Sequence, residues 1–200
     1  MARPVVPILS PSKIADAALE LVERSGDVQM TSLAKFLGVA PSSLYSHVQG
    51  REEVIDLARL RMLERIAPLP DGLGWEAAVE GLMRQLADHY SRHVKLLPLI
   101  FSTSISRERT IAIYEPVFAA LLDGGFRPDQ LRLIIGLIES QALGLAQGLP
   151  EPVISERIRA ALPAYTASID HSRYDKEAAT DFAVTVILGG LARMLPRSGE

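Results

Sequence analysis

Cysteine is absent from this chain of 200 residues. Its absence excludes disulfide bonds and any metal or redox site that needs a thiolate. It also fits a reducing compartment. The chain has no apolar run long enough to span a bilayer, and it lacks the basic segment and apolar core of a secretory leader. We therefore expect a soluble, cytoplasmic protein with no membrane partner.

An excess of positive charge is also lacking. The chain has 21 Lys and Arg residues against 24 Asp and Glu residues, which gives a net charge of −3. This balance does not draw the whole molecule to nucleic acid, so any DNA-binding surface must be a local feature. Apolar residues make up 48% of the chain, enough for a sizeable core.

No stretch shows the alternation of apolar and polar residues that marks a half-buried strand. Helical spacing of apolar residues instead begins at Lys13 and recurs along the chain. The predicted fold class is therefore all-α, with a small N-terminal unit of three helices, a linking helix and a larger C-terminal helical domain. The helices of the larger domain are expected at about 75–95, 97–103, 108–123, 128–148, 153–169 and 175–194.

Prolines and glycines mark the expected boundaries. Residues 1–12 hold three prolines and no periodicity, which predicts a flexible arm. Residues 13–57 form the N-terminal unit, and residues 58–74 hold the rest of the linking helix and a hinge at PLPDGLG. Residues 75–194 form the larger domain, and residues 195–200 form a tail.

Residues 29–48 have the pattern of a helix-turn-helix motif. A short helix ends at Gly38, and a second begins at Pro41, where the missing N–H of proline is not needed. In the second helix only Leu44 and Val48 have the spacing of core residues. A helix in this position places its outer face in the major groove of DNA.

The outer face of the second helix suits a DNA groove. Its side chains are small, hydroxylated or aromatic: Ser42, Ser43, Tyr45, Ser46 and His47. No acid lies between Val28 and Gln49, whereas Lys35 is basic. Such a window in an acidic protein is the local bias that phosphate binding needs. An ordinary three-helix bundle with a polar exterior fits the helix pattern equally well.

Residues 13–57 resemble the DNA-binding domain of the TetR family of transcriptional repressors. The matching run includes LGV and LYSHVQGREEV, and LYSHV with REEV and the later Trp75 resembles the tetracycline-repressor branch of the family. The resemblance implies that Tyr45 contacts a phosphate and that Arg51 lies near the DNA backbone. It also implies that Pro41, Ser42, Ser43, Ser46 and His47 form the groove-facing surface and that Thr31 occupies a position that can reach DNA. Lys35 joins this set because of its charge.

The same resemblance implies a function. In the family, the C-terminal domain dimerises and binds a small molecule. We therefore expect a homodimeric repressor that a small-molecule effector releases from a palindromic operator, with no catalytic residues and no cofactor. A helical metal hydrolase and a helical interaction module are the alternatives. The chain lacks GxSxG, HExxH and a phosphate-binding loop, which disfavours the enzyme.

Small residues recur every four positions in the helix expected at 128–148. They are Gly136, Ser140, Gly144 and Gly148. Each glycine inside a helix costs about 1 kcal/mol relative to alanine, so the stripe suggests that another backbone packs closely on it. That backbone could belong to the same chain or to a second copy. Ala183 and Ile187 give the last helix a compatible face for a dimer interface.

Polar residues interrupt or continue several apolar faces of the larger domain. His89 and His93 extend an apolar stripe, where they could line an effector pocket, bind a metal as an i, i+4 pair, or be satisfied histidines. Since no third ligand is evident, no metal is predicted. Glu139 and Gln141 could serve the pocket, the dimer interface or a surface edge. Phe101 and Tyr114 are expected as aromatic walls of the pocket.

Overall fold

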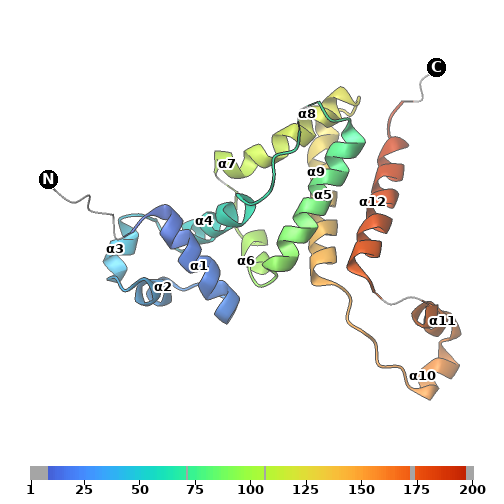
Figure 1. Ribbon diagram of the computed structural model, residues 1–200, viewed down its shortest axis with the longest axis horizontal. Coiled ribbons are helices and arrows are strands. Elements are labelled where there is room, and N and C mark those ends of the chain that lie inside the picture. Colours follow the sequence, from blue (N-terminus) through green and yellow to red (C-terminus); the bar gives the residue numbers. More distant parts are fainter. Residues whose placement is uncertain (1–8, 71, 106, 172–173, 197–200) are drawn as a thin grey trace.

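The computed structural model describes residues 9–70, 72–105, 107–171 and 174–196. Every regular element among them is a helix, so the predicted all-α fold class is confirmed. Figure 1 shows a small helical unit near the N-terminus and a larger group of longer helices beside it.

The N-terminal unit contains α1 (Pro11–Ser25), α2 (Met30–Leu37), α3 (Pro41–Tyr45) and the start of α4 (Arg51–Leu63). Helix α1 packs against α4 and α2, and α2 packs against α3. The apolar side chains that face one another are fully buried, among them Ile14, Leu33, Leu44 and Ile55. This core fixes the orientation of the two short helices.

The first helix begins two residues before the predicted boundary. The Ser10 hydroxyl accepts a hydrogen bond from the Lys13 amide at 3.2 Å, and Pro11 occupies the first turn. Serine is a strong N-cap and proline tolerates the first turn, so these residues extend the helix. Residues 1–8 of the expected arm and 197–200 of the expected tail lie outside the described residues.

The larger unit is built around α5 (Trp75–Arg92), which packs against α8 (Glu115–Asp123), α9 (Pro128–Gln147) and α12 (Lys176–Ala192). Figure 1 shows α5, α9 and α12 running side by side. Leu82, Met83 and Leu86 of α5 and Ile138 of α9 are fully buried in this core. The long helices predicted in this domain are therefore present.

Two helices that were predicted as continuous are divided. The segment expected at 108–123 consists of α7 (Glu108–Ile111), a 3-10 turn η1 (Ala112–Tyr114) and α8. Pro116 lies in the first turn of α8 and cannot donate a backbone hydrogen bond to the preceding turn, so the helix restarts there. The segment expected at 153–169 divides into α10 (Glu156–Ala161) and α11 (Pro163–His171) because the residue before Pro163 is disfavoured in helical geometry.

Helices α10 and α11 form a projection that we call the 149–171 arm. They contact each other but make few contacts with the rest of the described chain. Figure 1 shows them standing away from the other helices, at the end of the segment that follows α9. Leu149, Val153, Leu162 and Tyr165 are exposed apolar side chains of this arm.

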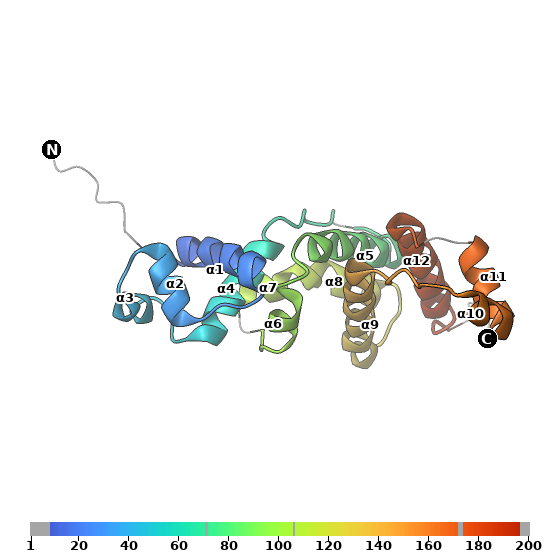
Figure 2. The same ribbon diagram turned by 90° about the horizontal axis from the view of Figure 1, so that it is seen from below.

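The two units are joined through α4. Its C-terminal half contacts the short helix α6 (Leu97–Phe101) and α7. Figure 2 shows α4, α6 and α7 between the α1–α3 group and the α5–α9 group. A displacement of α6 would therefore reach the N-terminal unit through α4.

Candidate DNA-binding surface and ligand pocket

The turn between α2 and α3 has the geometry that the helix-turn-helix pattern predicts. Gly38 closes α2 in the left-handed region, with φ of 68° and ψ of 32°. Glycine adopts this conformation without the steric cost of a Cβ atom. Leu44 and Val48 are buried beneath α3, so the opposite side of α3 faces outward.

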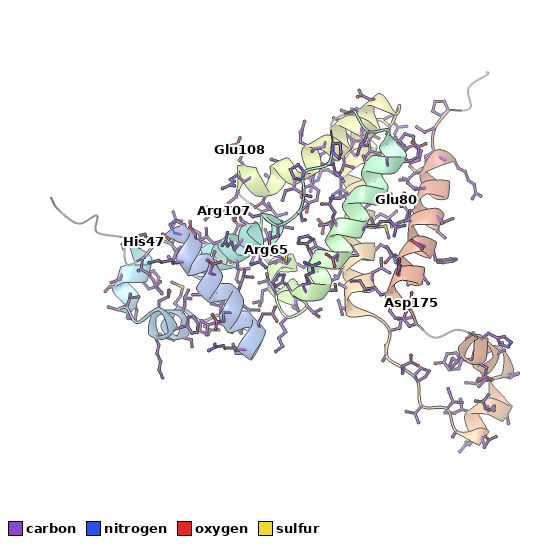
Figure 3. The ribbon with its side chains drawn as sticks, viewed as in Figure 1. His47, Arg65, Glu80, Arg107, Glu108 and Asp175 are labelled. Atoms are coloured by element: carbon purple, nitrogen blue, oxygen red, sulfur yellow. The ribbon has the colours of Figure 1, made fainter. Side chains whose placement is uncertain are left out.

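The predicted DNA-facing residues form one exposed surface on α2, α3 and the turn after α3. The exposed members are Thr31, Lys35, Pro41, Ser42, Tyr45, Ser46 and His47, while Ser43 is half-buried. Tyr45 is the one large aromatic side chain of this surface, with 56% of its surface exposed. Figure 3 shows His47 at this end of the molecule.

Arg51 differs from the other predicted contacts because its guanidinium group is held within the protein. It donates one hydrogen bond to the Val28 carbonyl at 3.0 Å and another to the Asp27 carboxylate at 2.5 Å. Asp27 lies in the turn between α1 and α2. Arg51 therefore braces this turn against the start of α4, and a phosphate contact would require it to leave Asp27.

The hydrogen bond from Arg51 is the main reason that the pKa of the Asp27 carboxyl lies below its usual value. A carboxyl whose pKa is lowered by folding stabilises the fold above its unfolded pKa of 3.8, and this contribution disappears as the pH falls through the lower folded pKa. Asp27→Asn should therefore lower the free energy of unfolding at neutral pH by less than about 1 kcal/mol, because the pair is partly exposed.

Urea unfolding at several pH values tests this prediction. The difference between wild type and Asp27→Asn should stay constant from neutral pH to about pH 5 and shrink below the unfolded pKa of 3.8. Asp16→Asn, which removes the exposed partner of Arg61, serves as a second ion-pair variant. A difference for Asp27→Asn that grows on acidification would contradict the assignment.

A mostly apolar cavity of about 660 Å³ opens between α4, α5, α6, α8 and α9. Its lining includes Arg59, Leu63, Tyr90, Ile100, Phe101, Thr103, Ile105, Ile111, Tyr114, Phe118, Arg132, Ile135, Gly136 and Glu139. Apolar walls with a few polar groups are the usual form of a small-molecule site. We call this the α4–α9 cavity.

A larger, more open groove of about 880 Å³ lies beside the start of α4. Its lining is rich in charged side chains that bind one another: Arg107 contacts Glu53 at 3.0 Å and Asp56 at 3.1 Å. Figure 3 labels Arg107 beside α4 and Glu108 on α7. Because this groove has little apolar wall, the α4–α9 cavity is the better candidate for a small-molecule site.

Three residues converge at the polar end of the α4–α9 cavity. The Tyr90 hydroxyl of α5 donates to one oxygen of the Glu139 carboxylate of α9 at 2.5 Å. The Tyr114 hydroxyl of η1 donates to the other oxygen. Burial, followed by the nearby negative charge of Glu139, raises the pKa of both tyrosines, so their hydroxyls remain protonated donors.

Arg59 joins the cavity to the linking helix. Its guanidinium group donates to the Asp56 carboxylate at 3.2 Å and to the Ser104 carbonyl at 3.1 Å. It also donates to the Thr103 hydroxyl at 2.7 Å and to the Ile100 carbonyl. Arg59 thus ties α4 to the C-terminal end of α6, where carbonyl groups lack helical partners.

The structure brings together only part of the predicted ligand set. Phe101, Tyr114 and Glu139 line the α4–α9 cavity, and Phe101 packs edge-on against Tyr90 with ring centroids 6.0 Å apart. Gln141 does not line it, because two residues beyond Glu139 turn the side chain by about 200° around the helix.

The two predicted histidines also lie outside the α4–α9 cavity. His89 is buried, with its Nδ1 atom 2.9 Å from the Gln85 carbonyl. His93 follows the end of α5 and points to the DNA-binding unit, with its Nδ1 atom 3.4 Å from the Glu23 carboxylate of α1. The apolar stripe of α5 thus includes His89 but not His93, because the helix ends at Arg92. Among the described residues, no cluster of three or more possible metal ligands includes either histidine.

The predicted dimer residues fall into two groups. Gly136, Ser140 and Gly144 are exposed and Gly148 is half-buried. Gly136 also lines the α4–α9 cavity. Ala183 and Ile187 instead lie in the core of the chain, because this side of α12 packs on α5 and α9. The exposed apolar side chains of the same two helices are Leu133 and Leu137 on α9 and Phe182 and Val186 on α12.

Sequence reasoning missed Arg59, Asp56 and Tyr90. Arg59 and Asp56 could have been found as an opposite-charge pair at i, i+3, because they lie in α4, a helix with buried residues on most of its faces. Tyr90 follows His89 directly and has no local pattern of its own that marks a site. Its role depends on Glu139, which is 49 residues away in sequence.

Comparisons with known proteins identify the class of this fold. No protein-family model matches the sequence. The chain is 30% identical over 150 residues to the HTH-type transcriptional repressor DrrR1 of Streptomyces coeruleorubidus, a match that covers 70% of this chain and 54% of that protein. It is 27% identical over 202 residues to an HTH-type transcriptional regulator of Saccharopolyspora erythraea, covering 93% and 86% of the two chains.

Solved structures with a similar fold include TetR family proteins. The TetR family protein ActR of Streptomyces coelicolor, in complex with actinorhodin, superposes with a TM-score of 0.76 at 19% identity and covers 97% of this chain and 100% of its own. The chain thus has the fold of the TetR family, and the predicted resemblance is confirmed. It spans about half of DrrR1. None of the described helices is both long and apolar enough to cross a membrane.

Proposed function

We propose that this protein is a dimeric, DNA-binding transcriptional regulator whose affinity for DNA is controlled by a small molecule in the α4–α9 cavity. The simplest form is a repressor that the ligand releases from a palindromic operator. The observation that carries the proposal is Arg59, which binds α4 to α6 at the wall of the cavity. Both curated relatives are HTH-type transcriptional regulators.

The exposed surface of α2 and α3 supports the DNA-binding part of this function. It combines hydroxyl groups, Tyr45 and Lys35 in a window without acids, and it lies at the far end of the molecule from α12. Two copies of this surface must lie about 34–36 Å apart to enter successive major grooves on one side of DNA. That geometry predicts an operator with two inverted half-sites.

The exposed apolar faces of α9 and α12 support the proposed pairing of two copies. Leu133 is 75% exposed and Phe182 is 74% exposed, and the two helices pack side by side. Two such helices from each copy would form a four-helix interface. The exposed glycines Gly136 and Gly144 would allow the backbones to approach closely.

The ligand would act through α6. A molecule wedged against Ile100, Phe101 and Thr103 displaces the carbonyl groups that Arg59 holds, and Arg59 transmits the displacement to α4. Helix α4 packs on α1, so the DNA-binding unit moves with it. Release requires that the ligand binds the displaced conformation more tightly than the DNA-bound one.

Binding to the DNA upstream of its own gene tests the proposed function. Tyr45→Ala should weaken binding to this DNA and to unrelated DNA alike by about tenfold, because a phosphate contact positions the protein without specifying sequence. Tyr165→Ala, at an exposed tyrosine of the 149–171 arm, is the matched control and should bind DNA as wild type does. Fluorescence anisotropy at fixed salt gives both affinities.

Two results would count against this function. A folded wild-type protein that binds upstream DNA no more tightly than unrelated DNA at low salt would not be a sequence-specific regulator. A loss of specific binding alone in Tyr45→Ala, with unrelated DNA unaffected, would move Tyr45 from the phosphates to a base.

A further inference from the structure

The polar end of the α4–α9 cavity offers hydrogen-bond acceptors and no free hydroxyl hydrogen. Tyr90 and Tyr114 each have one hydroxyl hydrogen, and both hydrogens are directed to Glu139. What remains for a bound molecule is the second lone pair of each phenol oxygen and the remaining lone pairs of the carboxylate. A ligand group at this point must therefore be a donor.

Arg59 lines the same cavity, but it does not change this balance between hydrogen-bond donors and acceptors. The hydrogens on its two terminal nitrogens are directed to Asp56, Ser104, Thr103 and Ile100. Its charge is also paired with Asp56, and both side chains are about 95% buried, with exposed fractions of 4% and 5%. The terminal nitrogens of Arg59 therefore already bind partners that connect α4 to α6 and the residues after it.

Glu139 has no ion-pair partner within the described part of the chain. Arg132 lines the same cavity from the same helix, but it is exposed and lies two turns earlier, about 10 Å along the helix axis. A carboxylate among apolar walls is normally paired with a cation. Two tyrosines hold this carboxylate in place by hydrogen bonds, without a direct ion pair.

We propose that the α4–α9 cavity takes an aromatic, largely apolar molecule that carries a cationic nitrogen group with N–H donors, and that this group binds Glu139. This inference rests on the proposed function, because it names the chemical class of the effector. Phe101 and Phe118 line the cavity and would pack against the aromatic part, while the N–H hydrogens of the cation meet the acceptors at the polar end. Tyr90 and Tyr114 act as positioning residues that fix the carboxylate.

Three acridines that share one ring system test the proposal in the absence of DNA. At mildly alkaline pH, 9-aminoacridine is a cation, acridine is neutral and acridine-9-carboxylate is an anion. Wild-type protein should bind 9-aminoacridine at least about tenfold more tightly than acridine, as measured by fluorescence titration. The anion should bind most weakly of the three.

Matched variants locate the effect. Glu139→Gln keeps the size and an acceptor oxygen, so it should lower the affinity for 9-aminoacridine by about tenfold and leave acridine within about twofold. Arg132→Gln, on the same helix and in the same cavity, should leave the affinity for 9-aminoacridine unchanged or raise it. Thermal unfolding of each variant confirms that it is folded.

Several outcomes would overturn the proposal. They are equal binding of all three acridines, an unchanged affinity of Glu139→Gln for the cation, no saturable binding of 9-aminoacridine, or a preference for the anion that is lost in Arg132→Gln. Operator binding is measured on the same samples. Specific DNA binding without a preference for the cation refutes only the ligand class, whereas absence of specific DNA binding refutes the proposed function.

Discussion

Replacement of Arg59 by alanine is expected to lower the free energy of unfolding by about 3 kcal/mol, the low end of the cost of breaking a buried ion pair. The low end applies because Asp56 keeps a second partner, Arg107, at 3.1 Å. The main loss is at the Ile100, Thr103 and Ser104 carbonyls, which lose a charged donor. For a chain of this size the midpoint of thermal unfolding should fall by about 10 °C.

Arg61→Ala provides the matched control for this prediction. Arg61 lies on the same helix and also forms ion pairs, with Asp16 and Glu64, but its side chain is 37% exposed. Its removal should lower the free energy of unfolding far less than the removal of Arg59, because water screens these exposed pairs. If Arg59→Ala and Arg61→Ala lose equal free energy of unfolding, the burial of Arg59 does not add to stability. Arg59→Lys keeps the charge but not the forked geometry and should be intermediate.

A charge on the exposed faces of α9 and α12 should abolish dimerisation. The double variant Leu137→Glu and Phe182→Glu places four carboxylates in the proposed interface of a dimer, where they would be desolvated and close to one another. We expect the dimer dissociation constant to rise by more than about a hundredfold, with a parallel loss of operator binding. Sedimentation equilibrium measures the first effect and anisotropy the second.

Val94→Glu is the control for added charge at an exposed apolar residue outside α9 and α12. It should remain a dimer. If the double variant also remains a dimer at micromolar concentration, the interface lies elsewhere and the exposed apolar faces of α9 and α12 need another partner. If it becomes monomeric but binds the operator unchanged, pairing is not required for DNA recognition.

Local patterns in the sequence predicted the architecture well. The spacing of Leu44 and Val48, the turn at Gly38 and the proline at position 41 each act over a few residues, and the structure has the corresponding elements. The division of helices at Pro116 and Pro163 was missed because the apolar periodicity continues through both prolines.

The cavity was predicted only in part, because its geometry depends on contacts far apart in sequence. Glu139, Tyr114 and Phe101 could be chosen as polar or aromatic residues in apolar surroundings. Tyr90 acquires its role only when α5 and α9 pack together. Likewise, the periodicity of α12 shows an apolar face at Ala183 and Ile187, but it does not distinguish the chain's own core from a partner's surface.

The 149–171 arm has a consequence for how association is measured. Its two helices have six and nine residues, below the length at which an isolated helix is stable in water, and they pack mainly on each other. Any surface that accepts this arm must therefore meet the entropic cost of ordering it. If a second copy provides that surface, subunit association and local folding become one thermodynamic step, with a larger negative heat-capacity change than the α9–α12 contact alone would give. The melting temperature would then depend on protein concentration.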